Sequence, residues 1–199
     1  MEKTDLLSVV RAETHQQHQQ LESVLPLSNP SLSAEDYKEV LKVFLGIFEP
    51  LEHALTHVEL PGDLEFEKRT RTKLLKDDLQ ALGLTAAEIS AIPRFEGLSA
   101  FPSPAHAMGV MYVLEGSTLG GQHVTRLLHD RMGLNADNGC SFFSSHGRDV
   151  GSMWKKFCEV VRHEVVVTRD REEFVNAAKW TFSSFEMWAV SRCPNSLIT

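Results

Sequence analysis

The 199-residue sequence predicts an all-α protein built as one helical bundle. Its apolar residues recur mostly at the three- and four-residue spacing of helices, and no segment alternates convincingly with a period of two. The valines at 165–167 form the only strand-like run, and one strand alone cannot make a sheet. The length suits a single domain over residues 1–199 with a substantial core.

Two helices are expected in the N-terminal part of the chain. The first starts after Thr4 and ends near Glu22, ahead of two prolines that interrupt regular structure. Ser33 is a suitable N-terminal cap for a longer helix over residues 33–58, because acidic residues follow it in the first turn. Pro50 should kink this second helix, since a proline inside a helix removes one backbone donor and clashes with the preceding turn.

The next stretch predicts one exposed helix and one short helix. Residues 65–82 are highly charged and are expected to form an exposed helix that stops at Gly83. Thr85 and Glu88 have the spacing of a capping box, which predicts a short helix that Pro93 ends.

Three further helices are expected in the C-terminal half. Ser103 and the proline after it open a helix over residues 104–132 with a glycine interruption in its middle. Residues 134–147 are rich in Gly, Asn and Ser and indicate a loop, and helices over about 150–166 and 170–191 follow. The last helix carries one apolar stripe, formed by Phe174, Ala178, Phe182, Phe185 and Trp188.

Composition narrows the class of protein. The formal net charge of -7 argues against nucleic acid as a partner, although a few local basic groups are enough to bind a small anionic ligand. No apolar run is long enough to span a bilayer and the N-terminus carries no secretory pattern, so we expect a cytoplasmic protein that does not enter the membrane. The three cysteines are far apart and predict neither a disulfide framework nor a CxxC metal site.

His18 lies on the face of the first helix that we expect to point inward. Leu7, Thr14 and Leu21 recur every seven residues and mark this face, and His18 follows Thr14 by four residues. The residues around His18 are mostly glutamine and histidine, so this part of the helix buries little apolar surface by itself. We therefore expect something other than packed side chains to occupy the space that faces His18.

The polar neighbours of His18 favour a metal-bearing ligand with carboxylates. Glu22 follows by four residues, and a carboxylate on one ring nitrogen would leave the other free for a metal. Arg11 and His15 precede His18 by seven and three residues and could meet the carboxylates of the ligand. Two other interpretations stay open. His18 could be an ordinary hydrogen-bonded core residue, or it could pair with His15 at a structural metal, although no nearby Cys or acidic residue completes a tetrahedral set.

A glycine-rich stretch, YVLEGSTLGGQ at residues 112–122, is the second feature that indicates a ligand. Gly116 and Gly120 are about one turn apart and Gly121 lies beside them, although each glycine inside a helix costs about 0.5–1 kcal/mol relative to alanine. Without Cβ atoms the backbone can approach a flat ligand closely. Close packing of another helix would leave the same pattern, so spacing alone does not separate the two.

Three segments together resemble the bacterial haem oxygenases, especially the group that supplies biliverdin to bacteriophytochromes. YVLEGSTLGGQ is similar to the distal-helix signature of that family, and RAETHQQHQQLE at 11–22 resembles its proximal helix. AAKWTFSSFEMWAV at 177–190 is similar to the family's last helix, whose aromatic side contacts the porphyrin. The resemblance implies a helical bundle with a haem slot between the first helix and a glycine-kinked distal helix.

The resemblance also implies roles for individual residues. His18 would be the proximal iron ligand, Glu22 its partner, and Arg11 and His15 the basic positions near the haem propionates. The residues matched to the distal side are Gly116, Ser117, Gly120 and Gly121, and those matched to the pocket wall are Phe182 and Phe185. Lys155 and Lys156 lie outside the matched motifs and are as consistent with surface charges as with propionate partners.

Ser117 departs from the pattern of many family members, which carry an aspartate directly after the first distal glycine to order proton-delivering water. The bacteriophytochrome-linked branch tends to carry serine there. The departure leaves the proton path to backbone groups and water.

The function implied is cleavage of haem, as both substrate and cofactor, to biliverdin, CO and ferrous iron. O2 and an external electron donor, a ferredoxin or a reductase, would be needed, and a bacteriophytochrome is the expected recipient of biliverdin. A haem carrier or sensor with the same pocket is the main alternative. A related helical fold also serves thiamin-degrading and quinone-forming enzymes, which would not need His18 to bind iron.

Overall fold

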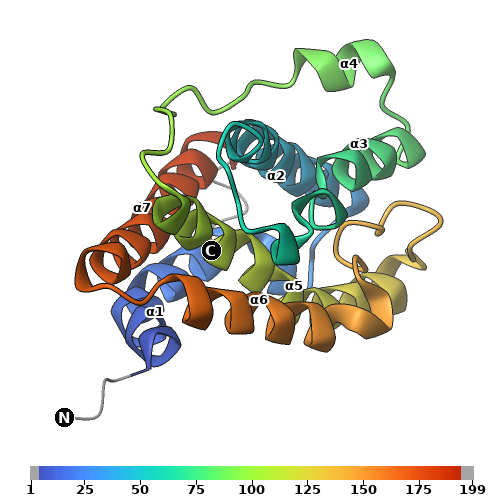
Figure 1. The fold of residues 1–199 in the computed structure, drawn as a ribbon. Coiled ribbons are helices and arrows are strands. Elements are labelled where there is room, and N and C mark those ends of the chain that lie inside the picture. The colour runs from blue at the N-terminus through green and yellow to red at the C-terminus, as the bar shows by residue number, and fades with distance from the viewer. Residues whose placement is uncertain (1–4, 194–199) are drawn as a thin grey trace.

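The structure, a computed structural model, describes residues 5–193, and the regular secondary structure of this part is all helical (Figure 1). No strand occurs among these residues, which confirms the all-α prediction. The α-helices are α1 (Leu6–Val24), α2 (Ala34–Leu55), α3 (Thr72–Ala81), α4 (Ala86–Ala91), α5 (Pro104–Met132), α6 (Val150–Glu164) and α7 (Thr168–Arg192). The short 3-10 helices are η1 (Pro26–Ser28), η2 (Gly62–Leu64), η3 (Phe66–Lys68) and η4 (Gly147–Asp149).

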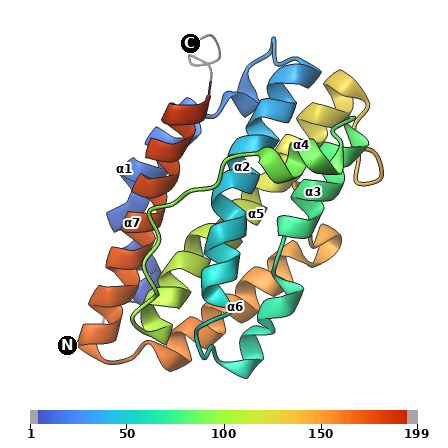
Figure 2. The same ribbon diagram turned by 90° about the horizontal axis from the view of Figure 1, so that it is seen from above.

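The helix α7 is central to the arrangement because it packs along both α1 and α5. In Figure 2 the first and last helices lie side by side, with α2 and α5 next to them and α3 and α6 beyond. The helix α1 makes its main contacts with α7 rather than with α5. Space between α1 and α5 is therefore left for the site described below. Among residues 5–193, none of the helices combines the length and apolar character that a membrane crossing requires.

The helix starts follow from local capping chemistry. Asp5 caps α1 by accepting a hydrogen bond from the Ser8 backbone, while Thr4 lies outside the described residues. The predicted start at Ser33 is confirmed by a full capping box with Asp36, and the predicted box at Thr85 is confirmed as well. The helix α2 continues through Pro50 and ends three residues earlier than expected, at Leu55.

The long helix predicted over residues 104–132 is confirmed, and its glycines do not break it. The helix α5 is continuous over 29 residues, and its glycines lie inside it. Glycine lowers helix stability without removing a backbone hydrogen bond, so neighbouring helices can hold the segment in helical form.

The prediction of one exposed helix over residues 65–82 is wrong in its first part, whereas α3 ends before Gly83 as expected. Two short 3-10 helices precede α3, which starts only at Thr72, and Glu65 between them has a left-handed backbone with φ 47°. The cause lies in Arg69 and Arg71, which are 3% and 2% exposed. Both side chains turn inward, and the Glu52 carboxylate accepts hydrogen bonds from the Arg71 and Thr72 backbones at 2.7 and 3.0 Å.

The predicted apolar stripe on the last helix is confirmed, and all five of its members are buried. The segment 134–147 is free of α-helix as expected, and the Asp78 carboxylate holds it by accepting from the backbones of Ser141 and Phe142 at 2.7 and 2.8 Å. The valines at 165–167 connect α6 to α7 and pair with no strand among the described residues.

Candidate functional site

A cavity of about 830 Å³ lies between α1 and α5, with α7, α6 and α2 completing its walls. This volume is within the range of about 300–1,000 Å³ found for small-molecule sites. Every residue that the sequence predicted for the site lines this one cavity. These residues are Arg11, His15, His18, Glu22, Gly116, Ser117, Gly120, Gly121, Phe182 and Phe185.

His18 reaches the cavity from α1, with 52% of its side chain exposed. Its Nδ1 lies 3.4 Å from Oε2 of Glu22, one turn later, and its ring meets the ring of Phe182 edge-on at 5.5 Å between centroids. Glu22 therefore engages Nδ1 and leaves Nε2 for a ligand. The interpretation of His18 as a buried core residue is excluded by its exposure. A structural metal pair finds no support, because no group of three or more metal-binding side chains occurs in the described part of the chain.

The three glycines of α5 differ in what surrounds them. A Cβ at Gly120 would meet nothing within 4 Å, and one at Gly116 would lie 3.9 Å from the Trp154 ring. At Gly121 a Cβ would overlap the backbone oxygen of Phe143. Gly121 therefore serves close packing against the 134–147 segment, although the alternative that the sequence left open was packing against another helix. Gly116 and Gly120 instead leave free space along the cavity wall.

Basic groups gather at the part of the cavity near the start of α1. Arg11 and His15 are exposed and form no ion pair within residues 5–193. Arg162 of α6, which the sequence did not single out, also lines the cavity, and its Nε lies 3.0 Å from the Asp5 carboxylate. The hydrogen bond from Arg162 lowers the pKa of Asp5. A carboxylate-bearing ligand would meet cationic side chains from two helices here.

The two lysines left undecided by the sequence lie outside the cavity lining. Lys155 is 3.8 Å from Glu159, and Lys156 is 2.6 Å from Glu65 on the connection before α3. The hydrogen bonds from Lys156 and then Lys68 lower the pKa of Glu65 to about 2. These lysines form surface ion pairs.

Ser117 is positioned by a hydrogen bond from Arg71, a residue that the sequence did not single out. Its hydroxyl donates to the Leu114 carbonyl oxygen at 2.6 Å and accepts from Nη2 of Arg71 at 3.1 Å. Arg71 also donates to the Leu114 carbonyl oxygen, and burial lowers the pKa of its guanidinium. No spacing rule links positions 71 and 117, so only the fold reveals this contact.

A buried ion pair lies next to this contact. Arg69 donates to the Glu115 carboxylate, and the side chains are 1% and 3% exposed. Burial raises the pKa of Glu115, while the charges of Arg69 and Arg71 oppose the rise. The carbonyl oxygens of Leu64 and Met153 also accept from Arg69. The wall of the cavity around Ser117 is therefore fixed by a network of buried charges.

Two aromatic residues that the sequence did not single out, Tyr112 and Trp154, complete the wall near Gly116. Their ring centroids are 5.6 Å apart, and burial raises the pKa of Tyr112. Cys158 also lines the cavity, and burial raises the pKa of its thiol to about 11, so the thiol stays protonated near neutral pH. The walls are thus mainly aromatic and aliphatic, with two imidazoles, two arginines and two carboxylates.

These residues fit haem. The His18 imidazole faces the cavity with Nε2 free, and the glycine backbone of α5 borders open space. Basic side chains that line the same cavity can bind acidic groups of the ligand. An apolar lining with few well-placed polar groups is typical of cofactor sites.

Comparisons with known proteins also identify haem oxygenases. The family model described as "Heme oxygenase" matches residues 4–190. A heme oxygenase of Xanthomonas campestris is 27% identical over 161 residues, which are 80% of this chain and 92% of that protein. The fold is similar to the heme oxygenase of Neisseria meningitidis solved with NO and CO bound, with a TM-score of 0.79, 19% identity and coverage of 96% and 93% of the two chains. A heme oxygenase of Synechocystis in complex with heme gives a TM-score of 0.78 at 15% identity, covering 98% and 95%.

Proposed function

Since the chain belongs to the haem oxygenase family, we propose that it cleaves haem to biliverdin, CO and ferrous iron with O2 and electrons from an external donor. One observation carries the proposal: His18 of α1 and the glycines of α5 line the same cavity. A planar macrocycle with a central iron needs an imidazole on one side and room for a small second ligand on the other. Bound haem supplies the redox chemistry, while the protein binds and orients it.

His18 is proposed to bind the haem iron through Nε2. Glu22, 3.4 Å from Nδ1, fixes the ring orientation and increases the basicity of the ligating nitrogen. Phe182 limits the rotation of the ring by its edge contact. These two contacts would hold the His18 ring in one orientation, with Nε2 available to the iron.

Cations at the start of α1 are proposed to bind the haem propionates. Arg11 and His15 were expected for this role from the sequence, and Arg162 joins them from α6. Charge-assisted hydrogen bonds to two carboxylates would fix the rotation of haem within its own plane. That rotation determines which edge of the macrocycle faces the glycines.

Gly116 and Gly120 are proposed to leave the space in which O2 reacts, with Phe185 and Trp154 closing the surrounding wall. A side chain at Gly120 would fill part of this space. Ser117 replaces the aspartate of many family members, so its hydroxyl and the groups behind it must orient water on this side.

The external donor is proposed to be a ferredoxin or a reductase, because cleavage of haem with O2 consumes electrons that neither haem nor the protein side chains supply. A bacteriophytochrome is proposed as the recipient of biliverdin. The support for this recipient is the resemblance of the YVLEGSTLGGQ segment, with serine at 117, to the branch that serves these photoreceptors.

The test is to mix the purified protein with haemin and follow the visible spectrum in air after adding ascorbate or a ferredoxin reducing system. Loss of the Soret band with growth of the broad biliverdin absorption, unaffected by catalase, is expected. A stable Soret band would indicate a haem carrier or sensor instead. Failure of haemin to change its Soret band on mixing would contradict haem binding altogether.

A further inference from the structure

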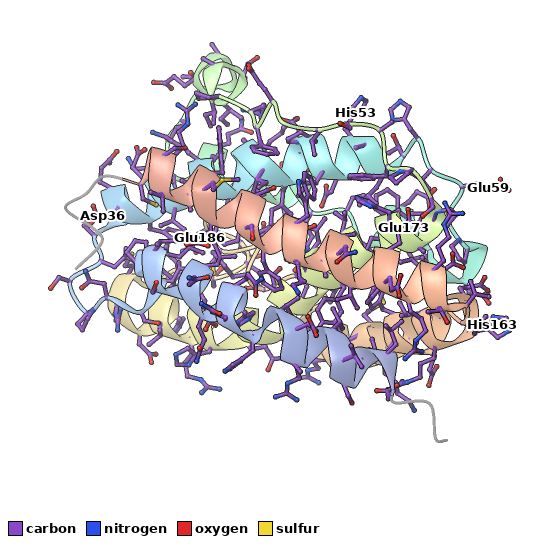
Figure 3. The ribbon with its side chains drawn as sticks, turned by 90° about the vertical axis from the view of Figure 1, so that its left-hand side faces the viewer. Asp36, His53, Glu59, His163, Glu173 and Glu186 are labelled. Atoms are coloured by element: carbon purple, nitrogen blue, oxygen red, sulfur yellow. The ribbon has the colours of Figure 1, made fainter. Side chains whose placement is uncertain are left out.

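An ion pair joins two walls of the cavity at the end where the basic groups gather. Asp5 caps the start of α1, Arg162 lies near the end of α6, and both line the cavity. Arg162 Nε donates to Asp5 Oδ1 at 3.0 Å. In Figure 3 the end of α6, marked by His163, lies close to the start of α1. Because α1 packs mainly on α7 and α6 mainly on α5, the pair links two helices with separate packing partners.

The second carboxylate oxygen of Asp5 has a different partner. Oδ2 accepts hydrogen bonds from the backbone N–H and the hydroxyl of Ser8, each at 3.3 Å, and thereby caps α1. Only Oδ1 accepts from Arg162. Asp5 can therefore release Arg162 and still cap its helix.

The Arg162 guanidinium is accessible to a second acid. The side chains of Arg162 and Asp5 are 52% and 41% exposed, and within residues 5–193 Asp5 is the only acceptor for Arg162. The hydrogen bond from Arg162 lowers the pKa of Asp5, so this carboxylate is ionised near neutral pH. Exposed ion pairs are nevertheless weak, because water and salt screen them. A carboxylate of an incoming ligand can therefore exchange with Asp5 at the guanidinium.

Asp5 offers Arg162 the same chemical group as a haem propionate. Each is a carboxylate that accepts charge-assisted hydrogen bonds from a guanidinium. The cavity lining contains two arginines, Arg11 and Arg162, and Asp5 already neutralises the second of them. Asp5 therefore reduces the attraction between the cavity and a ligand that carries two carboxylates.

We propose that Asp5 is an internal competitor of the haem propionates for Arg162. Its carboxylate leaves the guanidinium when haem enters the cavity, and it returns to displace a propionate when biliverdin leaves. This inference rests on the proposed function, in which Arg162 binds a propionate. Only hydrogen bonds are exchanged, so the step needs neither a proton nor an electron.

The competition has its main consequence for the product. Haem is also to be held through its iron by His18, whereas biliverdin has lost the iron and depends more on its two propionates. A protein carboxylate that takes back Arg162 therefore weakens the grip on biliverdin where that grip is strongest. Asp5 is expected to speed product release at the expense of somewhat weaker haem binding.

The first test replaces Asp5 by Asn, which has nearly the same shape and caps a helix equally well but carries no charge. Glu13→Gln is the matched control, because it removes one negative charge from the same helix. Glu13 pairs with Lys179 at 2.7 Å, is 49% exposed and does not line the cavity. The affinities for haemin and for biliverdin, and the rate at which biliverdin dissociates, are measured without a reductant, so that no turnover is involved.

For Asp5→Asn we expect haemin to bind about threefold more tightly and biliverdin to dissociate about threefold more slowly, a size set by the weakness of exposed ion pairs. Glu13→Gln should match the wild type, because salt screens distant exposed charges. Haemin with both propionates esterified should bind equally well to Asp5→Asn and to the wild type, since it offers Arg162 no carboxylate.

The second test uses Arg162→Gln as a background. In this variant there is no guanidinium for which Asp5 competes, so adding Asp5→Asn should leave the haemin affinity unchanged. A general effect of the lost charge at the start of α1 would persist without Arg162, and the double variant therefore isolates the pair.

The outcomes separate this inference from the proposed function. Unchanged or weaker haemin binding by Asp5→Asn would overturn the competition, because weaker binding would mean that Asp5 holds Arg162 in place for the ligand. Equal tightening without Arg162, or toward the esterified haemin, would overturn it as well. Each of these results leaves the haem oxygenase activity standing. A wild type that forms no biliverdin from haemin would overturn the proposed function and, with it, the role of Asp5 in product release.

Discussion

Nδ1 of His18 lies 3.4 Å from the Glu22 carboxylate, one turn further along α1. The i, i+4 spacing brings the two side chains together on the surface of one helix, so the pair forms without help from the rest of the fold. The carboxylate selects Nδ1 as its partner, and Nε2 becomes the nitrogen available to the cavity. In the proposed function, this relationship leaves Nε2 of His18 to bind the haem iron.

Replacement of Glu22 by Ala is expected to weaken haem binding by about tenfold, because partners of a metal-ligating histidine typically contribute 10–100-fold to affinity. The lower figure applies since Glu22 is 68% exposed. Titration with haemin, followed at the Soret band, measures the effect. Glu13→Ala is the control, because Glu13 pairs with Lys179 at 2.7 Å and does not line the cavity. Equal affinities of the two variants would refute the role of Glu22.

Alanine at Gly120 and at Gly121 should have opposite effects on stability. Gly120→Ala places its methyl in open space and should raise the free energy of unfolding by about 0.5–1 kcal/mol. The methyl of Gly121→Ala must push the Phe143 backbone away, and this variant should lower the free energy of unfolding by about 1–3 kcal/mol. Urea denaturation of both variants measures the two changes. A shift of the unfolding free energy in the same direction for both would contradict the assignment of Gly120 to open space and Gly121 to close packing.

A bulky residue at Gly120 should impair turnover more than haem binding. Gly120→Leu places its side chain on the α5 side of the cavity, where a Cβ meets nothing within 4 Å, whereas His18 and Arg11 line the cavity from α1. Haem affinity and the rate of biliverdin formation are measured on the same preparation. An equal loss of affinity and rate would count against Gly120 as a distal residue.

Local patterns predicted those features that depend on neighbours in sequence. The capping boxes at Ser33 and Thr85, and the approach of Glu22 to His18, follow from spacings of three and four residues. The helix predicted over residues 65–82 was wrong in its first part because the structure there depends on carboxylates that are distant in the sequence. Arg69 and Arg71 look like surface charges until Glu115 and Glu52 are brought to them by other helices.

The roles predicted for the site residues stay predictions. All ten positions line one cavity, yet Gly121 serves backbone packing, which spacing could not distinguish from ligand approach. Arg162 and Arg71 were missed because the motif on α1 and the motif on α5 contain no information about the elements that pack behind them.

Loss of the buried carboxylate at Glu115 should destabilise the fold strongly. Glu115→Ala leaves Arg69 charged and 1% exposed at its side chain, which should lower the free energy of unfolding by about 3–5 kcal/mol. Asp77→Ala breaks an exposed pair with Lys73, whose side chain is 83% exposed, and should cost less than about 1 kcal/mol. Urea denaturation compares the two, and similar small changes would show that the buried pair contributes little.

Mild acid should destabilise the protein through two partly buried histidines. Burial lowers the pKa of His106 and of His146, so each stays neutral in the folded state where the unfolded chain already binds a proton. The unfolded state then binds more protons below the ordinary pKa of 6.5, and stability falls as the pH drops from there through the folded-state pKa values. Urea denaturation midpoints across this window should decline less steeply in a His106→Asn, His146→Asn double variant. An equal decline would assign the effect to other groups.

The central claim is that His18 binds the haem iron, and the Soret spectrum of His18→Ala titrated with haemin tests it most directly. His15→Ala, one turn earlier on the same cavity wall, is the matched control and should keep the histidine-ligated spectrum. We predict that His18→Ala loses this spectrum and regains it when free imidazole is added. A His18→Ala spectrum identical to that of the wild type would contradict the account.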